Sequence, residues 1–278
     1  MVGMTARAKA ALRPRVSYPV ENLRVQVSAL ETATAQVLAK PRKDAVHHLR
    51  STTRRIEAHL EAIEVLGQQE PGFRAVEKMA TQVKKLLDRI RRAAGRVRDL
   101  DVRSNLAQEC SSKSATLTLK KEVKELRASM KAKRRADAAK LREVLDGHGR
   151  KLAPKLEVLL HALQPVANVG LSTVEQEVLT RDWYAEQVRK ARKGSDPTVA
   201  LHDIRKAAKL ARYLAENGLA GRVVNEFKAL QEAGGRWHDY MSLRDAARRQ
   251  LGKRSELARL AREKEMSARS AFEAMLAD

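Results

Sequence analysis

The sequence lacks what a disulfide-bonded, secreted or membrane-spanning protein needs. It has one cysteine, Cys110, so no internal disulfide can form, which favours a reducing compartment. No apolar run approaches the roughly 20 residues that cross a bilayer, and the N-terminal stretch has no apolar segment of the kind found in a secretory signal. We therefore expect a cytoplasmic protein without a membrane partner.

Glycine and proline are also scarce, with 13 and 7 residues, and they separate long stretches rich in Ala, Leu, Lys, Arg and Glu. These residues are the strong helix formers, and no alternating strand pattern interrupts them. The sequence predicts an all-α fold with helices at residues 20–39, 42–67, 73–95, 98–111, 116–146, 150–163, 172–193, 197–217, 222–234, 237–251 and 254–276.

Acidic residues are fewer than basic residues. The chain of 278 residues carries 56 Lys and Arg against 34 Asp and Glu, a formal net charge of +22. Such a field accumulates polyanions, so the candidate partners are nucleic acid, an anionic surface or an inorganic polyanion. The charge is spread along the whole chain, which excludes a single basic tail on a neutral body.

Two short motifs occur twice in the same order. "AVHHLRSTTRRI" at 45–56 aligns with "ALHDIRKAAKLA" at 200–211, and "GRVRD" at 95–99 aligns with "GRWHD" at 235–239. The order predicts an internal duplication that builds two pseudo-twofold-related helical bundles of about four long helices each. We expect a flexible basic N-terminus at 1–19 and one domain over 20–278, with halves at about 20–146 and 150–278.

Both copies of the first motif place a basic stripe beside an apolar face. At 100° per residue, Val46, Leu49 and Ile56 share one face of the first helix, as Leu201 and Ile204 do on the second. His47, Arg50 and Arg54 fall on a flank of the first face, and His202, Arg205 and Lys209 fall on the same flank in the second copy. Like charges at this spacing repel one another. The repeated stripe therefore predicts an anion that offsets the repulsion.

The segments "VHHLRSTTRRI", "LHDIRKAAKLARYL" and "GRVRDLDV" resemble the motifs of the CHAD family, the conserved histidine α-helical domains, from about residue 20 to the end. The resemblance implies two helical bundles that bind inorganic polyphosphate in a basic groove. It also implies a family motif at the bundle junction for Arg98, Asp99 and Asp101. The groove roles that it implies fall on His47, Arg50, Arg54, Arg55, His202, Arg205, Lys206, Lys209, Arg212 and Tyr213.

Further candidate phosphate ligands lie near these motifs. Lys43 is one turn before the first stripe, and the segment "KKLLDRIRR" at 84–92 offers Lys84, Lys85 and Arg91 on the next helix. Glu57 departs from the family pattern, because the aligned position in the second copy is Arg212. A carboxylate near the groove is expected to weaken or shape one half of it.

Two alternatives compete with non-catalytic polyphosphate binding. A nucleic-acid-binding protein comes second, because a basic groove accepts any polyanion, but base-stacking aromatics are few, with two Trp, four Tyr and three Phe. A phosphoryl-transfer enzyme using His47 or His202 comes third, because no Walker A motif or nucleophile elbow is present. The Asp99-x-Asp101 pair offers only two ligands to a metal ion, so we expect no catalytic residue, no cofactor and no metal. The expected location is the cytoplasm, with association with polyphosphate granules as a further option.

Overall fold

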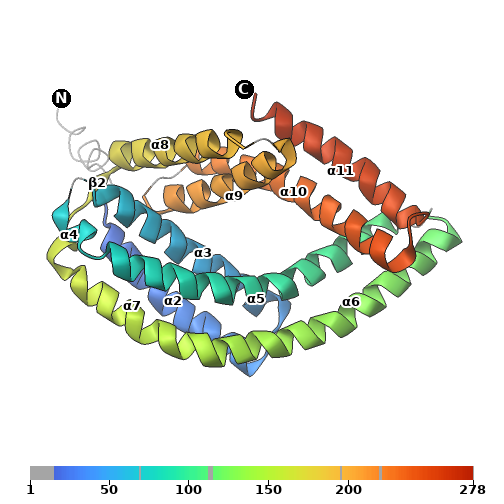
Figure 1. The fold of residues 1–278 in the computed structure, drawn as a ribbon, viewed down its shortest axis with the longest axis horizontal. Coiled ribbons are helices and arrows are strands. Elements are labelled where there is room, and N and C mark those ends of the chain that lie inside the picture. Colours follow the sequence, from blue (N-terminus) through green and yellow to red (C-terminus); the bar gives the residue numbers. More distant parts are fainter. Residues whose placement is uncertain (1–15, 69, 112–114, 195, 219–220, 278) are drawn as a thin grey trace, which may run out of the picture.

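The computed structural model describes residues 16–68, 70–111, 115–194, 196–218 and 221–277, and helices dominate these ranges (Figure 1). The expected flexible segment falls largely on residues 1–15, which lie outside the described residues. The helices are α2 (Pro19–Ala39), α3 (Lys43–Leu66), α4 (Pro71–Arg74), α5 (Glu77–Cys110), α6 (Leu117–Val144), α7 (Arg150–Ala162), α8 (Thr173–Arg192), α9 (Pro197–Glu216), α10 (Arg222–Leu251) and α11 (Glu256–Ala274).

The all-α prediction is confirmed, with one small addition. Strand β1 (Val16–Ser17) pairs antiparallel with β2 (Leu171–Ser172), which the sequence did not predict. At two residues each, these strands are too short to show an alternating pattern, and they fasten the start of α2 beside the start of α8. Within the described ranges, no helix has the length and apolarity of a membrane span.

Two predicted helix breaks are absent, because α5 and α10 each run through glycines. Helix α5 continues past Gly95 for 34 residues in all, and α10 continues past Gly234 and Gly235 for 30 residues in all. A Cβ on Gly95 would lie 3.2 Å from Arg50 Nη1, and a Cβ on Gly234 would lie 2.8 Å from Arg205 Cγ. These two glycines therefore admit an arginine of the neighbouring helix rather than ending their own.

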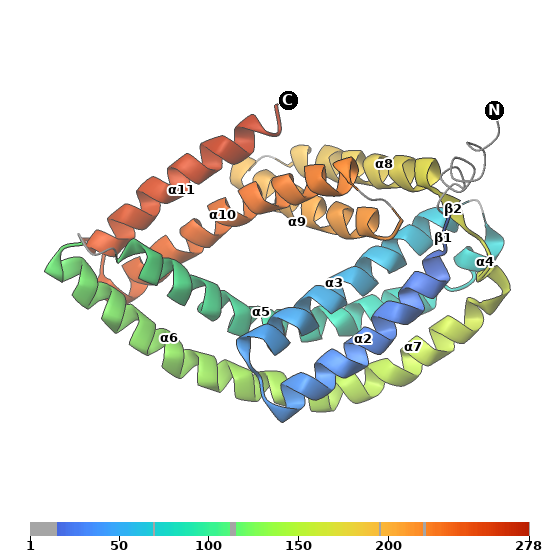
Figure 2. The ribbon, with the colours of Figure 1, turned by 180° about the vertical axis from the view of Figure 1, so that it is seen from behind.

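A third predicted break is a π-helical turn. Residues Leu145–Gly149 form a π-helix that links α6 directly to α7, so the two helices follow each other along one curved edge of the molecule (Figure 2). Gly147 and Gly149 carry no side chain that would oppose the wider turn, and π-helical turns of this kind occur as single-turn insertions in α-helices.

Separate apolar clusters hold the helices. The largest joins α2, α3, the first half of α5, the end of α6 and α7, and it also includes Leu210, Tyr213 and Leu214 of α9. A second joins the C-terminal part of α5 and the N-terminal part of α6 to α10 and α11, and smaller clusters join α8, α9, α10 and α11. The first cluster draws on both expected halves of the chain, and the duplication itself stays a prediction. Helix α3 contacts α9 directly, which brings the two copies of the basic stripe together.

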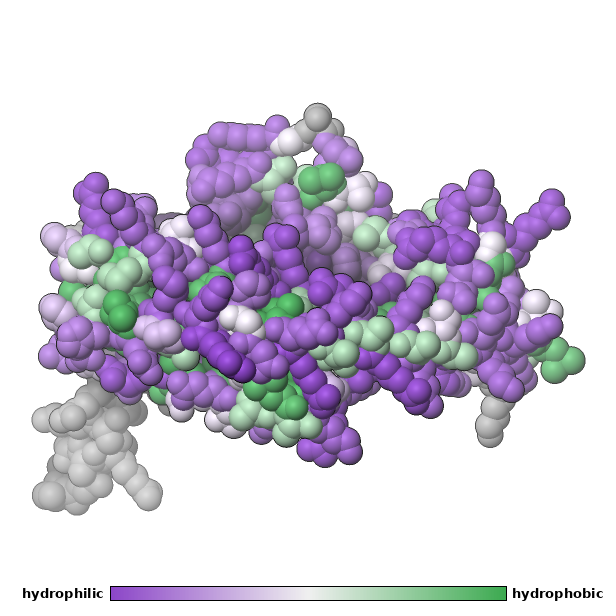
Figure 3. Space-filling view, turned by 60° about the horizontal axis from the view of Figure 1, so that its bottom comes forward, coloured by the Kyte–Doolittle hydropathy of each residue, from purple (hydrophilic) through white to green (hydrophobic). Residues whose placement is uncertain are grey.

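The surface of the molecule is mostly hydrophilic. In the space-filling view, hydrophilic side chains cover most of the visible face, and the hydrophobic ones are scattered in small groups among them (Figure 3). This distribution fits a chain in which charged residues make up 32% of the sequence and the apolar faces of the helices are turned inward.

Candidate functional site

A cavity of about 750 Å³ lies between α3, α5, α9 and α10, and we call it the central cavity. The helical phase predicted from sequence is confirmed, because Val46, Leu49 and Ile56 are fully buried and Ile204 is nearly so. The flank beside each apolar face then points between the helices rather than to open solvent. The central cavity is lined by His47, Arg50, Ser51, Arg54, Arg91, Arg98, Asp99, Val102, Leu106, Glu109, His202, Arg205, Lys206, Lys209, Tyr213, Gln231, Glu232, Gly235, Arg236, His238, Asp239 and Tyr240.

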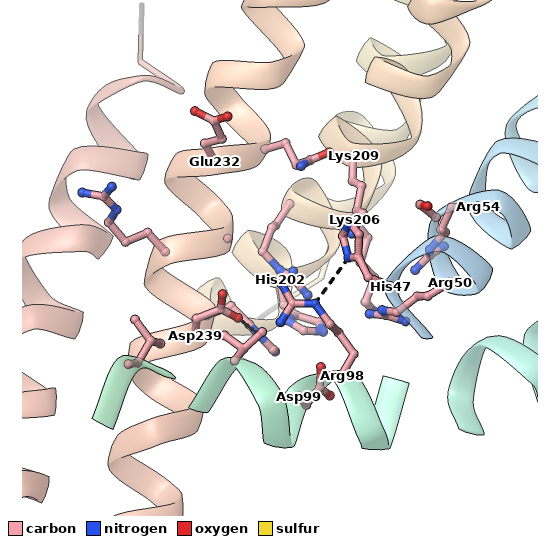
Figure 4. Close-up of a pocket in the computed structure, with 18 of the residues that line it drawn as sticks. His47, Arg50, Arg54, Arg98, Asp99, His202, Lys206, Lys209, Glu232 and Asp239 are labelled. Atoms are coloured by element: carbon pink, nitrogen blue, oxygen red, sulfur yellow. Dashed lines mark hydrogen bonds and ion pairs between the residues drawn. The ribbon is translucent and has the colours of Figure 1, made fainter. Parts of the chain in front are cut away.

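Nine of the predicted ligands share this lining. They are His47, Arg50, Arg54, Arg91, His202, Arg205, Lys206, Lys209 and Tyr213. Figure 4 shows the side chains of α3 and α9 approaching each other across the cavity, with Arg98 of α5 below them. The two basic stripes thus belong to one site, although they are about 155 residues apart in the sequence.

Five predicted ligands are not among the lining residues. Lys43 and Lys85 are exposed elsewhere, and Lys84 lies 2.7 Å from both Glu61 and Glu64. Arg55 and Arg212 both pair with Glu216, at 3.3 and 2.7 Å, and both guanidinium groups lie over the Tyr213 ring. Lys84, Arg55 and Arg212 are therefore paired with glutamates. Helical spacing alone does not reveal these partners.

The lining also contains residues that were not predicted to be ligands. Arg98 was expected at the bundle junction, yet its Nε lies 3.4 Å from His47 Nδ1 (Figure 4). The ring of His238, whose role was open, lies 5.2 Å from that of His202. Arg98 and His238 occupy matching places in "GRVRD" and "GRWHD", so the repeat was the signal that could have found both. Arg236 lies in the same repeat, whereas Ser51 and Gln231 had no comparable signal.

Four carboxylates accompany the cations. Asp99, Glu109, Glu232 and Asp239 line the cavity beside eight Arg and Lys side chains. Asp99 favours the charged form of Arg50, and Asp239 favours that of Arg205. Asp101, the other half of the Asp-x-Asp pair, instead receives Arg134 at 2.6 Å. Among the described residues, no group of three or more His, Cys, Asp or Glu forms a metal-ligand cluster.

The most buried cations of the cavity have no ion-pair partner among the described carboxylates. Lys209 shows this most clearly, because burial, followed by the charges of Arg50 and Arg54, lowers its pKa to about 7. Burial likewise lowers the pKa of Arg205 to about 10, and its Nε is buried without a hydrogen-bond partner. A cluster of desolvated like charges is costly unless an anion enters to offset it.

Burial and nearby cations favour the neutral form of both stripe histidines. Burial, followed by the charges of Arg205 and Lys206, lowers the pKa of His202 to about 4. Burial and then Arg98 lower the pKa of His47. Each neutral imidazole still has one N–H to donate, and a bound anion would favour the doubly protonated form.

Comparisons with known proteins agree with this architecture. The family model of the CHAD domain matches residues 21–248. The crystal structure of the CHAD domain from the plant Ricinus communis is similar with a TM-score of 0.64 at 17% identity, over 95% of this chain and 93% of that one. PptA from Streptomyces chartreusis is similar with a TM-score of 0.61 at 17% identity, over 96% of this chain and 100% of that one. No curated protein matches the sequence. With the matched region spanning most of its length, and with its helices arranged as in two solved relatives, this chain belongs to the CHAD domain family.

Proposed function

We propose that the protein binds inorganic polyphosphate in the central cavity and does so without catalysis. The observation that carries the proposal is the group formed by Arg50, Arg205 and Lys209, which are largely buried, face one cavity and have no ion-pair partner among the described carboxylates. Such charges are stabilised by a ligand that brings several negative charges at close spacing. A polyphosphate chain, with about one charge per phosphate, has that property.

The donor types suit a chain of phosphates. Arginine presents a planar fork that bridges two phosphate oxygens, and lysine supplies a compact charge. These donors come from α3 and α9 on facing sides of the cavity, with Arg91 and Arg98 contributed by α5. A narrow linear ligand between these helices would contact donors from several directions at once.

Nucleic acid fits the same cavity less well. Single strands are usually held by bases stacked on aromatic rings, and Tyr213 and Tyr240 are the Tyr, Trp or Phe residues in the described lining. Tyr213 is 4% exposed and has the guanidinium groups of Arg55 and Arg212 over its ring, so it offers no free face to a base. The proposal therefore favours a ligand that consists of phosphates alone.

The histidines are better suited to hydrogen bonding than to phosphoryl transfer. A nucleophilic side chain is normally activated and oriented by an adjacent base or carboxylate. His47 accepts a hydrogen bond from the cation Arg98, and the charges of Arg205 and Lys206 act on His202 more strongly than the carboxylate of Asp203 does. We assign both histidines to the ligand-binding wall.

A quadruple variant tests the proposal. Replacing Arg50, Arg54, Arg205 and Lys209 with Ala should abolish binding of long-chain polyphosphate, measured by isothermal titration calorimetry. Helicity should persist, because these side chains flank the apolar faces of α3 and α9 rather than form them, and circular dichroism checks this. Undiminished binding by a folded quadruple variant would place the ligand elsewhere.

We also propose a cytoplasmic protein that associates with polyphosphate granules. The lone cysteine supports the first part, since it fits a reducing compartment, and the proposed ligand supports the second. A fluorescent fusion should concentrate on granules, and the quadruple variant should spread evenly through the cytoplasm.

A further inference from the structure

The two sides of the central cavity differ in how their cations are compensated. On α9, Lys209 and Arg205 form no ion pair with a described carboxylate. On the opposite side, Arg54 of α3 and Arg91 of α5 share one carboxylate, that of Glu57. Arg54 and Lys209 occupy matching positions of the repeated motif, so the same position has a carboxylate partner in the first copy and none among the described carboxylates in the second.

The geometry around Glu57 is that of an internal ligand. Arg54 Nη1 donates to Glu57 Oε2 over 2.7 Å, and Arg91 Nε lies 3.7 Å from the same oxygen. The side chains of Arg54, Arg91 and Glu57 are 13%, 17% and 23% exposed, so water screens this group only in part. Arg91 additionally donates to Asp88. A carboxylate that receives two cavity-lining arginines occupies the role that a phosphate oxygen would take.

Glu57 does not use all the donors of these arginines. The Nε atoms of both Arg54 and Arg91 are buried without a hydrogen-bond partner. Both side chains line the cavity, whereas Glu57 and Asp88 do not. An incoming anion can therefore meet Arg54 and Arg91 in the cavity while Glu57, which is outside the lining, keeps its negative charge beside them and opposes the anion.

On this basis, and resting on the proposed function, we propose that Glu57 is a built-in counter-anion that competes with the bound polyanion for Arg54 and Arg91 and so lowers the affinity of the α3 side of the cavity. The ligand then engages Lys209 and Arg205 of α9 first, because neither forms an ion pair with a described carboxylate that would have to be outcompeted. The second copy has no carboxylate at this position. The aligned residue is the cation Arg212, which pairs with Glu216 outside the cavity lining. Glu57 thus weakens binding of the polyanion through Arg54 and Arg91 and does not contact the ligand itself.

The test compares Glu57→Gln with Glu216→Gln. Both changes remove one negative charge from the same helical protein and keep the shape of the side chain. In Glu57→Gln the amide oxygen of the new side chain can still accept a hydrogen bond from Arg54. Glu216 pairs with Arg55 and Arg212, which do not line the cavity, so its variant controls for the loss of one negative charge outside the lining. The readout is the Kd of a polyphosphate of defined length, measured by titration calorimetry over a series of salt concentrations.

We expect Glu57→Gln to bind about three- to tenfold more tightly at low salt, the order expected for one unit charge across a partly screened site. Its salt slope should also steepen by about 0.7–0.9, because one more cation is free to replace counterions on the ligand. Glu216→Gln should change the Kd by less than about twofold, since the same attraction acts over a longer and better-screened path. Asp88→Asn, which removes a carboxylate from Arg91 and from the exposed Arg92 and leaves Glu57 in place, should fall between the two.

Weaker binding by Glu57→Gln would overturn the proposal, because it would mean that Glu57 holds Arg54 in the binding position. Equal gains in Glu57→Gln and Glu216→Gln would also overturn it, because the effect would then be one of net charge. If Glu57→Gln does not fold, the Asp88→Asn variant gives the same decision through Arg91. Failure of the proposed function looks different, because the wild-type protein itself would then bind no polyphosphate.

Discussion

Lys209 offers the sharpest prediction, because its titration lies near neutral pH in the empty protein. Burial and the surrounding arginines lower its pKa from 10.5 to about 7. At pH 8 most Lys209 side chains are therefore neutral before ligand binds. A bound polyanion favours the ammonium form and raises this pKa again, so binding takes up a proton.

The sign of the pH dependence and its window follow from these values. Below about pH 7 Lys209 is already charged in the free protein, and it contributes no pH dependence. Above pH 7 each binding event must first protonate it, so affinity should fall by up to about tenfold per pH unit until the pKa of the complex is reached. Between pH 7 and pH 9 the loss should approach about 50-fold, because half of the Lys209 side chains are already neutral at pH 7.

Lys209→Arg isolates this effect. Arginine keeps its charge throughout the range, so the variant should bind at pH 9 nearly as tightly as at pH 7, as measured by titration calorimetry in buffers of different ionisation enthalpy. Lys206→Arg is the matched control, because Lys206 is exposed and pairs with Asp203 at 2.8 Å, and it should keep the wild-type profile. A wild-type affinity that is flat from pH 7 to 9 would show that Lys209 takes up no proton on binding.

The empty protein should show the opposite dependence in its stability. An unfolded lysine titrates near 10.4 and the buried one near 7, so the unfolded state binds more protons between these values and the free energy of unfolding rises with pH across them. Lys209→Met should raise the melting temperature at pH 7 and remove this rise, as scanning calorimetry would show. A lower melting temperature in Lys209→Met would mean that the ammonium group has a partner that stabilises it.

Three further outcomes are expected. Changing His47 and His202 together to Gln should remove the gain in affinity at acidic pH that these histidines add while leaving most of the salt dependence; an unchanged acidic profile would exclude them from binding. Burial lowers the pKa of His202 to about 4 and also lowers the pKa of His47, which extends that gain to lower pH than the region around 6 to 7 in which free histidine titrates. Incubation with polyphosphate, with or without Mg²⁺ and nucleotide, should release no phosphate and leave no phosphohistidine, and a labelled band that disappears in the double variant would identify an enzyme. Log affinity against log salt should have a slope of roughly −4 to −9 if six to ten phosphates are engaged, and a slope near −1 would contradict a multi-phosphate site.

The repeated basic stripe was the part of the site that sequence alone could place. Helical phase placed His47, Arg50, His202 and Arg205 beside the apolar faces of their helices. Those faces are buried in the packed structure, and the basic stripes beside them line one cavity. Helical content followed from residue types that favour helix in any context. These conclusions needed only local periodicity.

Tertiary contacts decided what the sequence could not. Gly95 and Gly234 were predicted to lie at helix ends, yet each admits an arginine of the cavity from the neighbouring helix, which only the packed structure reveals. Lys84 was predicted to be a ligand, but two glutamates of α3 hold it. Spacing along one helix says nothing about the carboxylates that a second helix brings.

Competition between polyanions separates polyphosphate binding from nucleic-acid binding. Long-chain polyphosphate, duplex DNA and single-stranded DNA, matched in total charge, are titrated against the protein at physiological salt with a labelled polyphosphate already bound. We predict that unlabelled polyphosphate displaces the label at far lower concentration than either DNA, because the buried donors of the central cavity admit a bare phosphate chain and Tyr213 offers no free face to a base. Displacement by DNA at equal or lower concentration would contradict polyphosphate as the ligand and make the protein a nucleic-acid-binding member of its family.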